Sequence, residues 1–235
     1  MLRINVVTLF PEVFEVPCHT SIMGRAAEQQ LVSYRVVDLR GYTHDRHRTV
    51  DDSPFGGGAG MVLKPEPFYE ALDDLAPVPP VVLLSARGEP FRHDMAVRYS
   101  VAEELTLLCG HYKDVDERVA LRDGVEQVAF GDAVLSGGEF AALCVMDAVV
   151  RLLPGALGDH DSAAGDSFYD GLLSPPSYTR PREYRGHAVP EVLVSGDHAA
   201  IEAWRRQQAL ELTQKRRPDL WARHEAEHRS DGTER

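Results

Sequence analysis

Residues 131–153 read GDAVLSGGEFAALCVMDAVVRLL, a segment with several glycines that continues directly into an apolar one. Its first eight residues hold three glycines, and an apolar run from Phe140 to Leu153 follows until Pro154 and Gly155 end it. Glycine lets a ligand lie directly against the backbone because no Cβ holds the ligand off. A helix that is apolar on nearly every face belongs inside a domain or in an oligomer interface. The stretch therefore predicts a ligand-holding loop mounted on a buried helix.

Arg151 is a charged residue near the end of this run, with valines before it and leucines after it. A guanidinium in such surroundings is costly unless an anionic or polar partner satisfies it. One candidate partner is the set of unpaired carbonyl groups at the end of its own helix. An external polar or anionic group is the other.

The composition is that of a globular protein. The chain has 235 residues, 43% of them hydrophobic, which suits one large domain or a main domain with a smaller one. Its three cysteines, Cys18, Cys109 and Cys144, have no metal-binding spacing, so we expect reduced thiols. The N-terminal segment lacks a signal-peptide cleavage site, and no apolar run reaches the roughly 20 residues of a membrane span. We therefore expect a cytoplasmic protein without a membrane partner.

Apolar and amphipathic segments alternate along the first two thirds of the chain. Because the apolar runs do not alternate with polar residues, they are typical of parallel strands that are covered on both faces. Strand and helix in alternation predict an α/β fold, a parallel sheet with helices on both faces. The expected strands are Ile4–Phe10, Val36–Leu39, Val81–Leu84, Leu105–Cys109 and Val125–Phe130, and the expected helices are Ser21–Gln30, Pro67–Leu75, Asp94–Val101 and Phe140–Leu153.

The composition changes after residue 157, where small polar residues and glycines predict a flexible linker over residues 159–170. This places a first domain at residues 1–158 and a second at residues 171–235. The second is expected to be small and helical, with helices at Ala199–Leu212 and Pro218–His228 and no strand of the earlier type.

The charge is unevenly distributed. The net charge of −12 argues against general nucleic-acid binding, which depends on neutralising phosphates. Between Arg180 and Arg217, however, eight basic residues face five acidic ones. An acidic body with a locally basic C-terminal part remains compatible with an RNA partner. The alternative is a solvated helical face of mixed charge.

Three of the expected strands run into turns that contain glycine: Ser85–Gly88, Gly110–Tyr112 and the loop that begins at Gly131. In an open parallel sheet, ligands bind beyond the carboxyl ends of the strands. If these strands are neighbours, their loops form one pocket walled by backbone. No phosphate-binding motif is present, so shape and backbone hydrogen bonds are expected to hold the ligand. His44 and His47, without a third strong ligand, favour a surface or substrate contact over a metal site.

Further motifs follow in order along nearly the whole chain: THDRHRTVDD (43–52), FGGGAGM (55–61), CGHYKDVDERV (109–119), GDAVLSGGE (131–139), RLLPGALG (151–158), DSFYDGLL (166–173), YTRP (178–181) and VPEVLVSGDH (189–198). In these motifs the chain resembles the bacterial tRNA (guanine-N1)-methyltransferases of the TrmD type, a family of the SPOUT superfamily. The resemblance implies methyl transfer from S-adenosyl-L-methionine to N1 of guanosine 37 in tRNA. It also implies a homodimer whose active sites use both chains, and a deep trefoil knot in the first domain.

Residue by residue, the resemblance assigns Asp166 as the general base and Arg151 as the catalytic arginine. The expected tRNA contacts are His44, Asp45, Arg46, Asp51 and Ser162. The expected cofactor-binding residues are Leu84, Ser85, Gly110, Phe130, Gly131, Asp132, Ala133, Val134, Leu135, Gly137 and Gly138.

The chain departs from the family pattern at three of these motif positions. Lys113 stands where many relatives have an acid, Asp114 where they have glycine, and Ala133 where some have tyrosine. The first two changes bear on the placement of the target guanine and of Mg²⁺, which the resemblance leaves room for as a second cofactor. A backbone contact through Ala133 survives the third change.

The implied chemistry suits these side chains. N1 of guanine carries a proton at neutral pH, and a carboxylate such as Asp166 can remove it as the methyl group arrives. The negative charge that spreads to O6 can be stabilised by a fixed guanidinium, which would give Arg151 its partner. Judged without the resemblance, Asp166 reads as a surface residue of the linker or as a helix N-cap. Because it lies in the expected linker, we expect residues 159–170 to become ordered only when tRNA docks.

Two other functions remain open from the sequence. One is an RNA-binding homologue that has lost catalysis, against which the presence of both Asp166 and Arg151 speaks. The other is a related SPOUT methyltransferase that acts on another RNA site.

Overall fold

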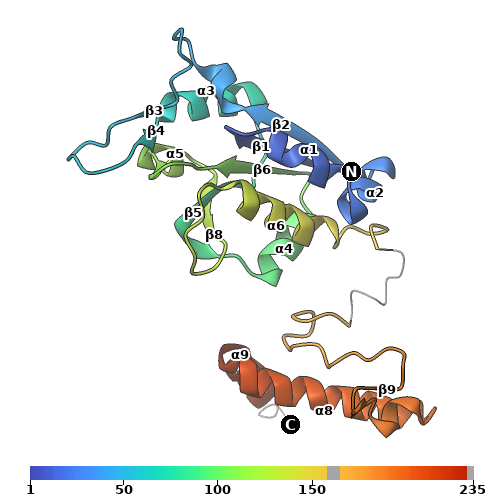
Figure 1. The fold of residues 1–235 in the computed structure, drawn as a ribbon. Coiled ribbons are helices and arrows are strands. Elements are labelled where there is room, and N and C mark those ends of the chain that lie inside the picture. The colour runs from blue at the N-terminus through green and yellow to red at the C-terminus, as the bar shows by residue number, and fades with distance from the viewer. Residues whose placement is uncertain (158–164, 232–235) are drawn as a thin grey trace. The chain divides into compact units, whose positions relative to one another are not determined.

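The computed structural model describes residues 1–157 and 165–231, with side chains through residue 227. The chain divides into two compact units, Met1–Gly158 and Asp159–Arg235 (Figure 1). The first unit is an α/β layer structure, and the second is built mainly from two helices.

The first unit is organised around a five-stranded sheet with the order β2-β1-β6-β5-β8. All four pairings are parallel, which confirms the expected parallel sheet. The strands are β1 (Leu2–Thr8), β2 (Val32–Asp38), β5 (Val81–Pro90), β6 (Glu104–Cys109) and β8 (Val125–Ala129). Each matches one of the five apolar runs, although β2 begins earlier than expected and β5 ends later. The trefoil knot stays a prediction.

Helices cover both faces of this sheet, as expected (Figure 1). One face packs against α1 (Glu12–Cys18), α2 (Ser21–Glu28), α4 (His93–Ser100) and α6 (Glu139–Val150). The other packs against α3 (Pro65–Leu75) and α5 (Glu117–Ala120). Successive strand residues point to opposite faces, so Val82 and Leu84 join the first core while Val81 and Leu83 join the second. This two-sided burial explains why the strands read as unbroken apolar runs.

Helix α6 is less enclosed than its composition suggests. It ends at Val150 rather than Leu153, and its inner side is buried at Ala142, Val145, Met146 and Val149. The side chain of Phe140 is nevertheless 63% exposed in the single chain, and Cys144 is also exposed. The helix is therefore buried on one side and open on the other in the single chain.

The Gly-rich motif FGGGAGM (55–61) lies between two short strands that pair with each other. A small sheet forms from β3 (Asp51–Asp52), β4 (Val62–Leu63) and β7 (Asp114–Val115), in which β4 lies between the other two. The short 3-10 helix η1 (Leu39–Tyr42) precedes it. The small sheet thus fixes both ends of the Gly-rich loop beside the segment that follows β6.

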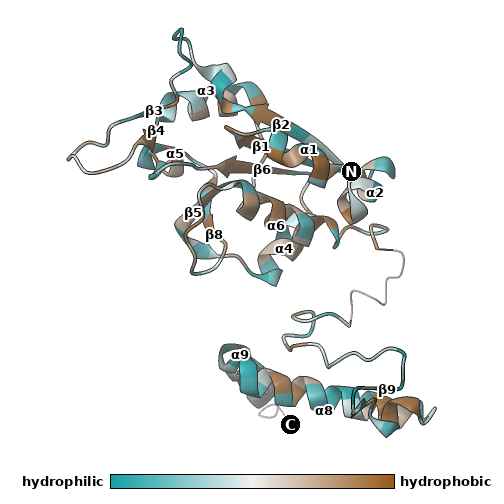
Figure 2. Cartoon of the chain, viewed as in Figure 1, coloured by the Kyte–Doolittle hydropathy of each residue, from teal (hydrophilic) through white to brown (hydrophobic). Residues whose placement is uncertain are grey.

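The second unit contains α8 (His198–Arg216) and α9 (Pro218–Asp231), both longer than the expected helices. Two shorter elements precede these helices. One is a hairpin of two-residue strands, β9 (Glu183–Tyr184) and β10 (His187–Ala188), and the other is the 3-10 helix η2 (Glu191–Val194). The sequence showed no strand here because two-residue strands are too short to leave an apolar pattern. Figure 2 shows the hydrophobic strands of the first unit and the mostly hydrophilic faces of the C-terminal helices. Within the described residues, no helix is long and apolar enough to cross a membrane.

Candidate active site

The three glycine-containing loops meet at one edge of the main sheet. Strands β6, β5 and β8 are neighbours and run parallel, so their carboxyl ends lie together. Leu84 and Glu89 of β5 both pair with Val128 of β8, so residues 85–88 bulge out of the sheet and form the first loop. The loops after β6 and β8 complete one cavity of about 140 Å³. The three strands are therefore neighbours, which is the condition for their loops to form one pocket.

Most of the residues expected to bind a cofactor line this cavity. They are Leu84, Ser85, Gly110, Phe130, Ala133, Val134, Leu135, Gly137 and Gly138. Gly131 and Asp132 do not line it. The lining also includes residues outside the expected cofactor-binding set: Ala86, Arg87, His111, Tyr112, Lys113, Asp114, Val128, Ser136 and Ala141.

Gly137 and Gly138 are needed by the packing of one loop on another. The Gly138 N–H donates to the Gly110 carbonyl at 2.8 Å, and His111 forms an isolated β-bridge with Gly137. A Cβ on Gly138 would lie 2.8 Å from Cα of Cys109. On Gly137 it would meet the His111 ring and the carboxylate of Glu139 closer than atoms can approach. The glycines therefore let the third loop lie against the end of β6, in addition to any access they give a ligand.

A buried carboxylate lies beneath these glycines. Glu139, in the first turn of α6, is only 4% exposed, and its Oε1 accepts a 2.8 Å hydrogen bond from Oγ1 of Thr8. Nδ1 of His111 is 3.9 Å from Oε2 of Glu139 and is buried without a hydrogen-bond partner in the described part of the chain. Burial raises the pKa of the nearby Cys109 thiol, and the Glu139 carboxylate adds to the effect. Cys109 is therefore a neutral thiol at pH 7.

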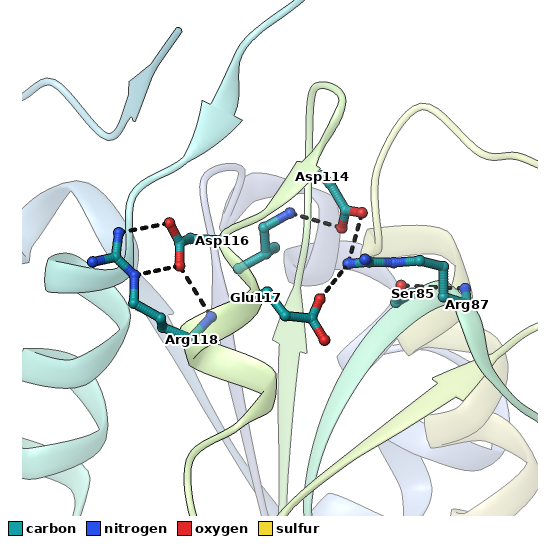
Figure 3. A network of polar contacts seen from close by, with 7 residues as sticks. Ser85, Arg87, Asp114, Asp116, Glu117 and Arg118 are labelled. Carbon is teal, nitrogen blue, oxygen red and sulfur yellow. Dashed lines mark hydrogen bonds and ion pairs between the residues drawn. The ribbon is translucent and has the colours of Figure 1, made fainter. Parts of the chain in front are cut away.

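Arg87 links the first loop to the segment that follows the second. Its guanidinium lies 2.9 Å from Oδ2 of Asp114 and 2.9 Å from Oε2 of Glu117 (Figure 3). The Arg87 N–H also reaches Oγ of Ser85 at 3.3 Å within its own loop. Because all three charged side chains are partly exposed, these pairs hold the loops in place more than they stabilise the fold. The sequence did not reveal this arrangement, since the partners are far apart along the chain.

Asp116 has a separate role in the same region. It caps α5 by accepting from the Arg118 N–H at 3.0 Å, and it pairs with the Arg118 guanidinium at 2.8 Å (Figure 3). The hydrogen bond from Arg118 lowers the pKa of the Asp116 carboxyl. Asp116 therefore orders the start of α5 and is turned to Arg118, away from the Arg87 cluster.

The two expected catalytic residues lie in different units. Arg151 is the C-cap residue of α6, where its N–H donates to the Asp147 carbonyl at 3.2 Å. It is partly buried, as the apolar run predicted. Asp166 belongs to the second unit and is also partly buried.

The expected tRNA-contacting loop is mostly exposed and internally braced. Nε2 of His44 is 2.8 Å from Oε2 of Glu70. The carboxylate of Asp45 accepts from the side chain and N–H of Thr49 and from the His47 N–H, bonds that lower its pKa. Asp45 therefore shapes the loop.

Other members of the expected contact set differ in setting. Arg46 is exposed, whereas Asp51 lies in β3, and Ser162 is outside the described residues. Among residues 1–157 and 165–231, no group of three or more histidine, cysteine, aspartate or glutamate side chains is placed to hold a metal ion.

Comparison with known proteins agrees with this architecture. The family model described as tRNA (Guanine-1)-methyltransferase TrmD matches residues 2–223. The chain belongs to the TrmD family. A tRNA (guanine-N(1)-)-methyltransferase of Moorella thermoacetica is 52% identical over 227 residues, which cover 94% of this chain and 91% of the relative. Relatives of the same name from Dehalococcoides mccartyi and Brevibacillus brevis are each 48% identical, covering 94% and 93% of this chain and 90% and 91% of the relatives.

The TrmD match covers both units, because it begins in β1 and ends within α9. TrmD proteins are SPOUT proteins, which agrees with the parallel sheet and its loops at one edge. The family match therefore covers the unit with the cavity and most of the helical second unit.

Proposed function

We propose that this protein transfers a methyl group from S-adenosyl-L-methionine to N1 of guanosine 37 in tRNA. The observation that carries the proposal is the cavity formed by three loops in a chain that belongs throughout to the TrmD family. A tRNA substrate places the proposed reaction in the cytoplasm.

The cavity suits the donor in its chemistry. Apolar side chains such as Leu84, Leu135 and Ala141 line it beside backbone groups of glycine. Such a lining favours a flat base and a ribose, held by shape and backbone hydrogen bonds. When bound, the donor supplies an already activated methyl group on a sulfonium centre. The lining carries charges of both signs, because Arg87 and Lys113 lie beside Asp114, and Arg87 is paired with Asp114 at 2.9 Å.

Asp166 and Arg151 are proposed to act on the guanine. The carboxylate of Asp166 takes the proton from N1, which frees the lone pair that accepts the methyl group. The guanidinium of Arg151 stabilises the negative charge that develops on O6. Much of the remaining acceleration comes from holding the two reactants in line.

The second unit offers a surface for the tRNA backbone. Arg180, Arg182 and Arg205 line a groove of about 920 Å³ that is formed by residues 165–182, η2 and α8. Guanidinium groups bind phosphate oxygens with two parallel hydrogen bonds, which suits an RNA strand. In the first unit, the loop with His44, Arg46 and the internally bonded Asp45 is proposed to contact tRNA as well, and Asp51 and Ser162 complete the proposed contacts.

The protein is proposed to act as a homodimer. The large apolar side chains of the first unit that are strongly exposed in the single chain include Phe55 at 100%, Val134 at 90% and Phe140 at 63%. Phe140 lies on the open side of α6, and Val134 lies on the third loop. A second copy of this chain would cover such residues in an isologous interface.

The test is methyl transfer from labelled donor to an unmodified tRNA transcript, with the modified atom identified by mass spectrometry. We expect N1-methylguanosine at position 37, and no product from a transcript with adenosine there. Asp166→Asn should lose at least about 100-fold in single-turnover rate, in the range of lost acid–base catalysis, while calorimetry shows unchanged donor affinity. Transfer without a guanosine at position 37 would indicate another RNA site.

Two controls define the alternatives. Donor and tRNA binding without any transfer would identify a catalytically silent RNA-binding homologue. Replacing magnesium with EDTA in the same assay tests Mg²⁺, the second cofactor that the family resemblance leaves room for.

A further inference from the structure

The segment that carries Asp166 is attached to α8 within the second unit. The Leu173 N–H donates to Oγ1 of Thr213 at 2.9 Å, and the Arg206 guanidinium donates to Oδ2 of Asp170 at 2.8 Å. Thr213 is completely buried, and its hydroxyl donates to the Ala209 carbonyl one turn earlier at 2.7 Å. Its orientation is therefore fixed by the helix, so that its oxygen is available to Leu173.

The same segment is also closed on itself. The Ser174 N–H donates to Oγ of Ser167 at 2.9 Å, and the hydroxyls of these two serines are 2.9 Å apart. The Phe168 N–H donates to the Leu172 carbonyl at 2.6 Å, and Leu172 is only 1% exposed. Phe168 has a φ of +78°, a conformation that non-glycine residues keep only when their surroundings enforce it. Residues 167–174 therefore form a fixed turn.

Of the expected linker over residues 159–170, residues 159–164 lie outside the described residues, and its ordering by tRNA stays a prediction. Residues 165–170 have the composition of a linker, but Ser167 and Asp170 have specific partners. Asp166 directly precedes the turn, and its carbonyl accepts from the Tyr169 N–H at 3.4 Å. Its backbone is thereby placed relative to α8.

We propose that α8 is the platform that positions Asp166, with Thr213 and Arg206 as positioning residues that do not touch the reacting atoms. This inference rests on the proposed role of Asp166 as the general base. Thr213 holds the far end of the turn through Leu173, and Arg206 holds its tip through Asp170.

The two attachments differ in character. The pair of Arg206 and Asp170 is about half exposed, and such pairs are weak when isolated. The bond to Thr213 is part-buried, and its loss leaves a backbone N–H without a partner. A displacement of about 1 Å at a catalytic group can lower a rate by roughly 100-fold. Loosening either attachment should therefore affect the chemical step more than binding.

The experiment measures the single-turnover rate of methyl transfer at saturating donor and tRNA, together with the Kd of each ligand. Thr213→Val keeps the shape of the side chain and removes the hydroxyl, whereas Thr213→Ser retains the hydroxyl. Arg206→Met removes the second attachment from an exposed position where folding is unaffected. Arg216→Met is the matched control, since it removes the same charge from the same helix at an exposed residue.

We expect Thr213→Val and Arg206→Met to lower the rate by about 10- to 100-fold, as for a displaced catalytic group, with each Kd within about twofold of wild type. Thr213→Ser and Arg216→Met should retain the wild-type rate. In the double variant Thr213→Val with Asp166→Asn, the losses should not add, because one residue acts through the other. Additive losses would overturn the inference.

Two further outcomes separate the inference from the proposed function. If Asp166→Asn loses its activity but Thr213→Val and Arg206→Met keep theirs, the platform is wrong and the base assignment stands. If Asp166→Asn keeps the wild-type rate, the base assignment fails and the inference fails with it.

Discussion

Replacing Gly138 with alanine distinguishes two properties of glycine, its conformational freedom and its lack of a Cβ. Gly138 has φ −75° and ψ −11°, a conformation that alanine adopts readily. If conformational freedom alone mattered, Gly138→Ala would stabilise the fold by about 0.4–1 kcal/mol through the unfolded state. The added Cβ, however, would lie 2.8 Å from Cα of Cys109 and 3.0 Å from N of Gly110. Both are backbone atoms at the end of β6, so they cannot turn aside as a side chain would.

The structure allows the cost to be worked out. Relief of the clash requires the third loop to move off β6, which costs about 1–3 kcal/mol for overpacking. The movement also stretches the 2.8 Å bond from Gly138 to the Gly110 carbonyl, which contributes about 0.5–1.5 kcal/mol. After the entropic gain is subtracted, we expect a net destabilisation of about 2 kcal/mol. In a chain of this size that lowers Tm by roughly 4–8 °C.

The measurement is thermal unfolding by differential scanning calorimetry, combined with calorimetric titration of S-adenosyl-L-methionine. Gly41→Ala is the control, because a Cβ there meets nothing within 4 Å and the backbone needs no positive φ. Its Tm should stay close to wild type, whereas Gly138→Ala should fall and bind the donor more weakly. A Gly138→Ala protein as stable as wild type would refute the argument that loop contact requires this glycine.

Three further substitutions test other contacts. Thr8→Val removes the hydrogen bond to the buried Glu139 carboxylate and should cost about 1–3 kcal/mol in urea denaturation; unchanged stability would contradict this. Arg87→Met should change stability by less than about 1 kcal/mol but weaken donor binding severalfold, and calorimetry showing wild-type affinity would count against it. Burial raises the pKa of Cys18 from 9.0 to about 11, so the folded protein holds this proton more tightly than the unfolded chain. The free energy of unfolding should therefore fall as pH rises from about 9 to about 11. The fall should be smaller in Cys18→Ala, which lacks the thiol. Denaturation of both proteins at several pH values measures the two changes in the free energy of unfolding.

The strands of the main sheet could be predicted because burial on both faces leaves a run of apolar residues. Val81–Leu84 illustrates this, since alternate residues enter the two cores. Helix α1 was missed because it is seven residues long, contains Pro17 and buries only Phe14 and Cys18. The strand order, with β6 between β1 and β5, depends on how distant segments pair and leaves no local pattern.

The parts of the candidate site that depend on strand ends could be predicted from the sequence. The parts that depend on side-chain contacts between residues far apart along the chain could not. Three strands that end in glycine turns indicated one pocket, and the neighbouring order of β6, β5 and β8 meets that condition. The contacts of Arg87 with Asp114 and Glu117 could not be inferred, because charged residues at any spacing can also be solvated. The attachment of Asp170 to Arg206 was hidden for the same reason, since it joins residues that read as a linker and as a helix surface.

The glycines of the third loop correctly indicated the position of the pocket. Access for a ligand, however, is only one of the reasons why glycine is present there. Gly131 has φ +72° and nothing within 4 Å of its Cβ position, so its backbone conformation is what requires glycine. Gly137 and Gly138 have no positive φ, and protein atoms fill the space that a Cβ would need. A ligand pocket and a tight contact between loops therefore produce the same sequence signal. Here the contact builds the pocket, because only a loop that lies against Gly110 and His111 can close the cavity after β6.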